Sequence, residues 1–217
     1  MLNKKLLVLW GLVSFPVLAV KFEMKDLGQR NLILVDSEAA IERTVAISHF
    51  VTGWVEVAPE NMESIQGEFE VDVRTLDTGL ELKNIQIRDQ LLSSNEFPLA
   101  KATFTHSLAG QKLKLGDGKS FTIKVNANVQ LKNVTKSIPI QIKLTYFKES
   151  DESRQRLTGN LLKFSASWDL DLANFNIMIP SKYSSLIAKT VHVSADLVGS
   201  DRLPNNALSL PEGIKKK

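Results

Sequence analysis

The stretch FTIKVNANVQLKNVTKSIPIQIKLTY, residues 121–146, decides the fold class. Apolar side chains occupy every second position of residues 121–131, and the same alternation resumes over residues 138–146. A period of two is typical of a β-strand with one buried face and one face in water. Between the two runs, Asn133-Val134-Thr135-Lys136 predicts a turn, in which Asn133 accepts the left-handed conformation that tight turns often need. The stretch is therefore predicted to form a long antiparallel hairpin.

Further runs with this alternation indicate a mainly β protein. They cover residues 65–74, 162–170 and 191–197, with weaker candidates at 41–50, 52–57, 102–108 and 112–115. A sheet of about eight antiparallel strands tends to close on itself or to split into a sandwich, because long open edges invite aggregation. No internal repeat and no Pro/Ser/Gly-rich linker divides the chain, so one domain is expected over residues 20–200.

One segment departs from the period of two. Residues 79–94, GLELKNIQIRDQLLSS, place Leu80, Asn84, Ile87 and Leu91 at helical spacing. Thr78 and Glu81 before and within this segment fit a capping box, in which the two side chains bond the backbone at the helix start. The sequence therefore predicts one helix over residues 79–94 that begins at a Thr78 cap.

The triplet Asp77-Thr78-Gly79 is also the one with which aspartic proteases present a catalytic carboxylate. Aspartic proteolysis needs two carboxylates about 3 Å apart that share a proton, so the triplet must occur twice or the protein must be a symmetric dimer. The triplet occurs once, and the helical pattern begins directly after it. We interpret Asp77 as a residue that bonds nearby backbone, and we predict no catalytic residue in the chain.

The N-terminal residues indicate export, and the C-terminal residues indicate a solvated tail. Residues 1–19, MLNKKLLVLWGLVSFPVLA, combine two lysines, a short apolar run and a small residue at Ala19, which predicts a secretory signal peptide cleaved after Ala19. Residues 201–217 are expected to be a solvated C-terminal tail. Its Lys215–Lys217 run is the chain's one dense basic run, which argues against a nucleic-acid partner and leaves a transient contact with an anionic membrane surface as a lesser possibility. The oligomeric state stays open.

The remaining composition excludes several classes of site. The chain has no cysteine, so disulfides and lipid attachment through an N-terminal cysteine are excluded. Its three histidines lie far apart without a metal-binding motif, and no phosphate or dinucleotide motif is present, so neither a metal nor a cofactor is predicted. An outer-membrane barrel also alternates, but it needs aromatic girdles that so few tryptophans and tyrosines cannot supply.

Three segments resemble a known family. The run VRTLDTGLELKNIQIRDQLLSSNEFPLAKATF, residues 73–104, carries Asp77-Thr78-Gly79 after a strand, Arg88-Asp89 on the helix and Phe97-Pro98 before the next strand. This order resembles the centre of the YceI-like proteins. The strand, turn and strand of residues 129–144 are similar as well, with Asn133 where glycine is usual and Ser137-Ile138 where Pro-Val is usual.

The third segment departs further from the family. Asn174-Phe175-Asn176-Ile177 stands where the family tends to have Arg-x-Asp-Phe-Gly-Ile, and Leu172, Asn174 and Asn176 do not follow that pattern. These departures remove charge from a loop that is a candidate to meet a ligand head group. The resemblance covers roughly residues 31–200.

The resemblance implies a single antiparallel eight-stranded lipocalin-like barrel with the helix closing one side, exported to the periplasm. It further implies a non-catalytic protein that sequesters or carries a long apolar ligand, a polyisoprenoid or a fatty-acid-type lipid, inside the barrel. The candidate ligand-binding residues are the inward-facing positions Phe69, Val71, Ile123, Val125, Ala127, Ile140, Ile142, Phe164, Ala166 and Val193.

Two alternatives stay open from the residues alone. Small side chains at Gly67, Ala127, Ala166 and Ala195 either leave a channel for a lipid or relieve crowding in a filled barrel, as expected of a stress-response or interaction protein. The other alternative is a small-ligand enzyme in the barrel mouth that uses Asp89 or His106 as its base.

Overall fold

The computed structural model describes residues 19–108 and 113–202 of the 217-residue chain. The predicted signal peptide and C-terminal tail lie outside these ranges except for residues 19, 201 and 202. Within the described residues, no helix is both long and apolar enough to span a lipid bilayer.

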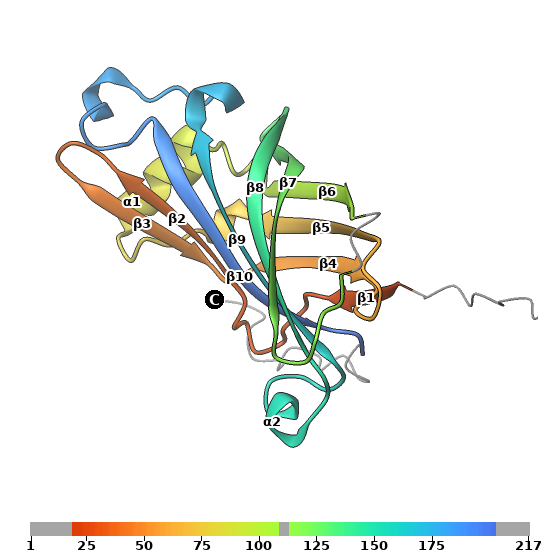
Figure 1. Cartoon of the computed structure of the whole chain (residues 1–217). Coiled ribbons are helices and arrows are strands. Elements are labelled where there is room, and N and C mark those ends of the chain that lie inside the picture. Colours follow the sequence, from red (N-terminus) through yellow and green to blue (C-terminus); the bar gives the residue numbers. More distant parts are fainter. Residues whose placement is uncertain (1–18, 109–112, 203–217) are drawn as a thin grey trace, which may run out of the picture.

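Ten strands form one antiparallel sheet in the order β1-β4-β5-β6-β7-β8-β9-β10-β2-β3, and β1 also pairs with β10. The strands are β1 (Val20–Glu23), β2 (Leu32–Glu38), β3 (Arg43–Ser48), β4 (Val51–Val57), β5 (Ser64–Asp72), β6 (Leu99–Ser107), β7 (Ser120–Leu131), β8 (Val134–Phe147), β9 (Leu161–Asp171) and β10 (Thr190–Ser200). Figure 1 shows β7 to β10 crossing β4 to β6 steeply, as in a closed sheet.

The ten strands make eight positions in the barrel wall. Strand β10 pairs with β2 over residues 192–196 and with β1 at Ser200, so β1 and β2 are two halves of one wall strand. In the same way β3 pairs with β2 while β4 pairs with β1, and the two are separated only by His49 and Phe50. The prediction of a closed eight-stranded antiparallel barrel is confirmed.

The strand predictions differ from the structure mainly at the start of the chain. Strand β2, with the sequence LILVDSE, has no clear alternation, and neither it nor the four-residue β1 was predicted. Of the weak candidate at 112–115, the described part makes only an isolated bridge from Leu113 to Met62. Over β7 the alternation holds, because Val125, Ala127, Val129 and Leu131 are buried while the polar residues between them are exposed or half-buried.

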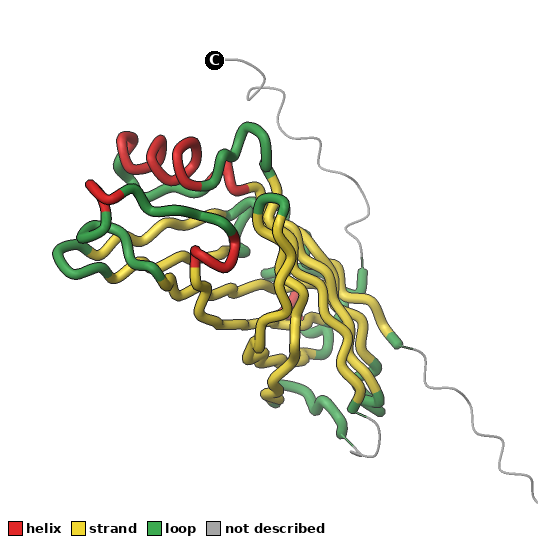
Figure 2. Tube along the Cα trace, turned by 90° about the horizontal axis from the view of Figure 1, so that it is seen from above, coloured by secondary structure: helices red, strands yellow, loops and turns green. Residues whose placement is uncertain are grey.

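The helices and long loops lie mostly at one end of the strands (Figure 2). At this end lie the short turns η1 (Val73–Thr75), η3 (Leu172–Phe175) and η4 (Ser181–Tyr183), and helix α1 (Glu81–Ile85), which continues as the π-helix η2 (Gln86–Leu91). Helix α2 (Asp151–Arg154) lies at the opposite end (Figure 1). The predicted helix over residues 79–94 is thus present, but it is shorter and half of it is a π-helix.

The predicted capping box is wrong. The helix begins after Leu80, so Thr78 stands two residues too early to cap it. Instead Asn84, buried on the helix, reaches back: its Oδ1 accepts from the Thr78 N–H (2.8 Å) and hydroxyl (2.9 Å), and its Nδ2 donates to Asp77 Oδ1 (2.7 Å). Asp77 also accepts from the Gly79 N–H at 2.8 Å, which confirms that it bonds nearby backbone. These bonds fasten the helix to residues 77 and 78, and the Asp77 backbone pairs in turn with Ile47 of β3.

Two residues with a left-handed backbone conformation stand where the sequence departs from the predicted turn and from the family pattern. Strand β8 begins at Val134, so the hairpin turn is Lys132-Asn133, and Lys132 rather than Asn133 has the positive φ of 56°. The predicted role of Asn133 is therefore wrong. In the third family-like segment, Asn176 takes a φ of 56° at the end of η3. Asparagine tolerates this region better than other residues with a side chain, so it replaces glycine there at small cost.

Candidate functional site

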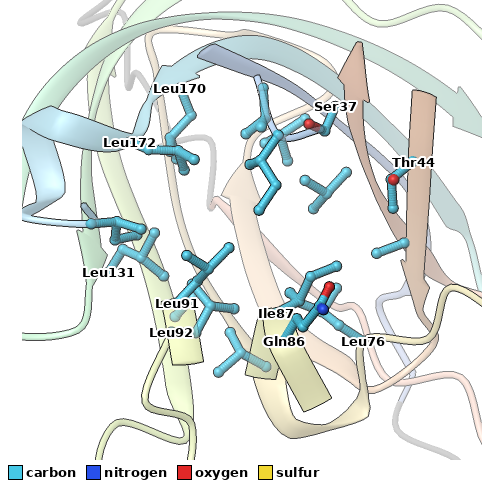
Figure 3. Close-up of a pocket in the computed structure, with 18 of the residues that line it drawn as sticks. Ser37, Thr44, Leu76, Gln86, Ile87, Leu91, Leu92, Leu131, Leu170 and Leu172 are labelled. Atoms are coloured by element: carbon cyan, nitrogen blue, oxygen red, sulfur yellow. The ribbon is translucent and has the colours of Figure 1, made fainter. Parts of the chain in front are cut away.

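A cavity of about 190 Å³ lies inside the barrel at the end covered by the helix. Strands β2, β3, β5, β6, β7, β9 and β10 supply its walls, and α1, η2 and residues 172–187 cover it. The lining is apolar except at one edge. Figure 3 shows Leu131, Leu170 and Leu172 on one side, with Ser37 and Thr44 of the β2–β3 hairpin on the other.

The strand period and the helix period both bring side chains to this cavity. Ile33, Val35 and Ser37 alternate along β2, and Thr44 and Ala46 alternate along β3. On the covering helix, Ile87 and Leu91 are four residues apart and therefore share a face, which points toward the strands in Figure 3. The cavity is thus enclosed by the inner face of the sheet and the apolar face of the helix.

Three links hold the β2–β3 hairpin against its neighbours at the polar edge. Lys83 on α1 pairs with Glu42 and donates to Thr44 Oγ1 at 3.0 Å. On the other side, Ser37 Oγ accepts from the Ala188 N–H at 3.0 Å, and the Ile41 N–H donates to the Ser185 carbonyl at 3.2 Å. Since the charges of Lys83 and Glu42 offset each other, the edge offers polar contacts without a strong net charge.

A second cavity of about 80 Å³ lies deeper in the barrel. It is lined by aromatic and small apolar side chains and shares part of its lining with the outer cavity. The shared residues are Ile33, Val71, Ala100, Val129 and Trp168. We call the two spaces the outer and the inner chamber.

The small interior residues divide between the two alternatives that the sequence left open. Ala127, Ala166 and Ala195 line the inner chamber, as expected if small side chains leave room for a ligand. Gly67 does not line either chamber. A Cβ placed on it would lie 2.8 Å from the Phe104 ring, so this glycine relieves crowding.

The structure places the predicted ligand-binding residues at different depths. Val71 and Val193 line the outer chamber, whereas Ile123 and Val125 line neither chamber. The inner chamber is bordered by Phe69, Val71, Ala127, Ile140, Ile142, Phe164 and Ala166. Most of the predicted set thus lies deep in the barrel, below the larger space.

Sequence reasoning missed the residues that cover the outer chamber. Ile87 and Leu91 carried a signal, because their helical spacing predicted an apolar face that must pack on something. The hairpin residues Ser37 and Thr44 carried none, since β2 lacks the alternation that would have shown which side chains point inward.

The residues considered for catalysis do not meet at this site. Asp89 is exposed, and neither it nor His106 lines the outer or the inner chamber. The hydrogen bonds from Asn84 and Gly79 lower the pKa of Asp77, which fits a fixed acceptor in the helix anchor. Among the described residues, no group of three or more His, Asp or Glu side chains is placed to hold a metal ion.

Comparison with known proteins gives a family and a set of similar folds. A family model described as a YceI-like domain matches residues 34–199. No curated protein matches the chain. Among solved structures, a polyisoprenoid binding domain from Saccharophagus degradans implicated in plant cell wall breakdown is 16% identical, with a TM-score of 0.62 over 84% of this chain and 98% of that one.

Two further structures share the fold. BcnA of Burkholderia cenocepacia is 15% identical, with a TM-score of 0.61 over 80% of this chain and 99% of its own. The YCEI protein of Campylobacter jejuni is 9% identical, with a TM-score of 0.54 over 70% of this chain and 82% of its own.

Proposed function

Because this chain belongs to the YceI-like domain family, we propose that it is a non-catalytic periplasmic binding protein whose barrel sequesters or carries a long apolar ligand. The observation that carries the proposal is the pair of apolar chambers inside a closed barrel. The structural neighbour described as a polyisoprenoid binding domain supports a polyisoprenoid as the ligand class, with a fatty-acid-type lipid as the related choice.

The size and lining of the outer chamber suit a hydrocarbon chain. An apolar cavity of about 150 Å³ is enough to bind benzene, and the outer chamber has about 190 Å³. Each methylene group that leaves water for such a space contributes about 0.8 kcal/mol. A chain segment of several carbons therefore binds firmly without any directed polar contact.

The polar edge indicates how the ligand is oriented. Ser37, Thr44 and Gln86 offer hydrogen bonds there, while Glu42 and Lys83 offset each other's charge. A polar head group thus finds partners at this edge, whereas the deeper lining suits the apolar chain. We place the head group at the hairpin edge and the chain toward the inner chamber.

Exposed apolar side chains near the same edge support a transient contact with a membrane surface. Ile41, Leu82 and Met178 are 75%, 77% and 79% exposed. Each directly adjoins in sequence a residue that lines the outer chamber, namely Glu42, Lys83 and Ile177. Apolar side chains beside the outer chamber, at what we take as its entrance, would let a lipid pass between bilayer and barrel without crossing water.

The proposal is tested by the lipid content of the purified protein. Full-length protein expressed with its export sequence is recovered from the periplasm, its N-terminus is sequenced, and native mass spectrometry shows whether a lipid is bound. We expect a chain that starts at Val20 and a bound apolar lipid. Protein that is empty, and that stays empty after incubation with polyprenol or fatty acid, contradicts the carrier function.

A matched pair of variants shows whether the lipid occupies the outer chamber. Ala46 lines this chamber on β3, so Ala46→Phe places a ring inside it, whereas the adjacent Val45 faces the other side of the strand. We expect Ala46→Phe to lose the bound lipid and Val45→Phe to keep it, with both variants folded by circular dichroism. Equal lipid content in the two variants places the ligand elsewhere.

A further inference from the structure

The border between the two chambers is made by five residues from five different strands. They are Ile33 on β2, Val71 on β5, Ala100 on β6, Val129 on β7 and Trp168 on β9. Trp168 is by far the largest, and the others are aliphatic and small to medium in size. A chain that passes from the outer to the inner chamber must pass this tryptophan.

Trp168 is held in place by packing alone. Its side chain faces the interior yet stays half-buried, and it borders both empty spaces. Its indole N–H is buried and finds no hydrogen-bond partner among the described residues, which is unusual because a buried tryptophan N–H is normally bonded. Turning the indole therefore breaks no hydrogen bond.

The inner chamber beside Trp168 is small, and three phenylalanine rings line it. Phe69, Phe104 and Phe164 pack together there, with ring centroids 4.6 Å apart for Phe69 and Phe164 and 6.2 Å apart for Phe104 and Phe164. The chamber's 80 Å³ is roughly half of the volume that admits benzene. It therefore has room for the end of a chain, a few carbons, and no more.

We propose that Trp168 sets how deep an apolar chain enters the barrel and so determines the preferred chain length. This inference rests on the proposed lipid-binding function. With the indole in place, a chain fills the outer chamber, and only its last few carbons reach the inner chamber. A smaller side chain at position 168 joins the two chambers and admits more of the chain.

The test uses linear prenols of two to nine isoprene units and the delipidated full-length protein after export, with affinities from displacement of a fluorescent fatty acid. In the wild type, affinity should rise with length until both chambers are filled and then level off. Trp168→Ala should move this plateau to a longer prenol, and Trp168→Phe should move it less.

Ala166→Val gives the opposite change, because it adds two methyl groups to the inner chamber. Each buried methylene is worth roughly fourfold in affinity, so two should cost roughly fifteenfold for long prenols and little for the shortest. Ser167→Val adds similar bulk on the exposed face of the same strand and should change nothing. Melting curves confirm that each variant is folded.

The outcomes separate the inference from the function on which it rests. A plateau that moves in opposite directions in Trp168→Ala and Ala166→Val supports the role of Trp168. A wild type that binds prenols with a plateau that neither variant moves, or variants that change all lengths by one factor, refutes it and leaves the carrier function standing. A wild type that binds no prenol or fatty acid overturns both.

Discussion

The two ends of the barrel share the same alternating strand pattern, but the interior of one end is packed with side chains and that of the other contains a cavity. At the end near β1, which we call the closed end, large side chains fill the space completely: Phe22, Met24, Met62, Ile65 and Leu108 are at most 1% exposed. At the end under the helix, which we call the open end, interior residues such as Val35 and Ile187 stay half-buried around the outer chamber. Alternation therefore indicates which face is inside, but not whether that inside is filled.

The cover of each end explains the difference. A polar segment, residues 24–31, crosses the closed end and is anchored by Asp26, whose side chain is only 1% exposed. Asp26 accepts from Arg30 Nε at 2.9 Å and lies 3.0 Å from Arg156 Nη2. The open end is covered by a short helix that is fastened at its start through Asn84 and to the hairpin through Lys83. Arg88 adds a third bond, from its Nε to the Leu76 carbonyl at 2.6 Å. The closed end is thus covered by an extended segment that bonds the wall directly, whereas the open end is covered by a helix held through side chains, with space beneath it.

The largest expected effect comes from cutting one leucine at each end of the same strand face. Leu162 on β9 is fully buried, while Leu170, eight residues along, borders the outer chamber. Leu162→Ala should lower the free energy of unfolding by about 3–4 kcal/mol, because it opens a cavity in a packed region. Leu170→Ala should cost about 2 kcal/mol, at the low end of the usual range, because Leu170 already borders empty space and makes fewer contacts. Urea denaturation of both variants without lipid checks this.

Equal losses in the free energy of unfolding for Leu162→Ala and Leu170→Ala would contradict the difference in packing between the two ends. Equal losses near 3–4 kcal/mol would mean that the open end is as tightly packed in solution as the closed end. As a control, the denaturation of wild type and Leu170→Ala is repeated with bound prenol. A larger loss of stability with prenol than without it reports contacts between Leu170 and the ligand.

The wall of the barrel is predictable from the sequence, whereas its interior is only partly so. Residues 121–146 predict the longest hairpin because apolar and polar side chains alternate there except at the turn and at Pro139. The π-helix and the inward side chains of β2 depend on packing against strands that are distant in the sequence, so no local sequence pattern predicts them. Thr78 shows a further limit: a capping signature was present, yet the buried Asn84 outcompetes it by bonding both Thr78 and Asp77.

A smaller effect is expected from the buried carboxylate of the closed end. Burial alone would raise the pKa of Asp26, but the hydrogen bonds from Arg30 and the Gly28 N–H and the charge of Arg156 together lower it. Asp26→Asn should therefore cost about 2 kcal/mol at neutral pH, since it removes charged hydrogen bonds and takes the carboxylate partner from two arginines. Denaturant titrations from neutral to acidic pH provide the measurement.

The sign of the pH dependence follows from the lowered pKa. The stabilisation by Asp26 is complete above the unfolded-state pKa of about 3.9 and is lost as the pH falls through the lower folded-state value. The difference between wild type and Asp26→Asn should therefore be constant near neutral pH and shrink below about pH 4. Asp36→Asn, at an exposed pair with Arg43 near the open end, should cost at most about 1 kcal/mol. A loss for Asp36→Asn as large as that for Asp26→Asn would remove the contrast between the ends.

The smallest effect on stability, and the sharpest on function, is expected where the helix meets the hairpin at the open end. The Lys83 and Glu42 side chains are 22% and 34% exposed, so Lys83→Met should change the free energy of unfolding by less than about 1 kcal/mol. The same substitution removes the link between α1 and β3 beside the outer chamber, so bound prenol should dissociate several-fold faster. Lys21→Met breaks an exposed pair with Glu23 on β1, and neither residue lines a chamber, so this substitution should leave dissociation unchanged. If both variants release prenol at the wild-type rate, the open end is held by its packing and the ion pair does not control the entrance.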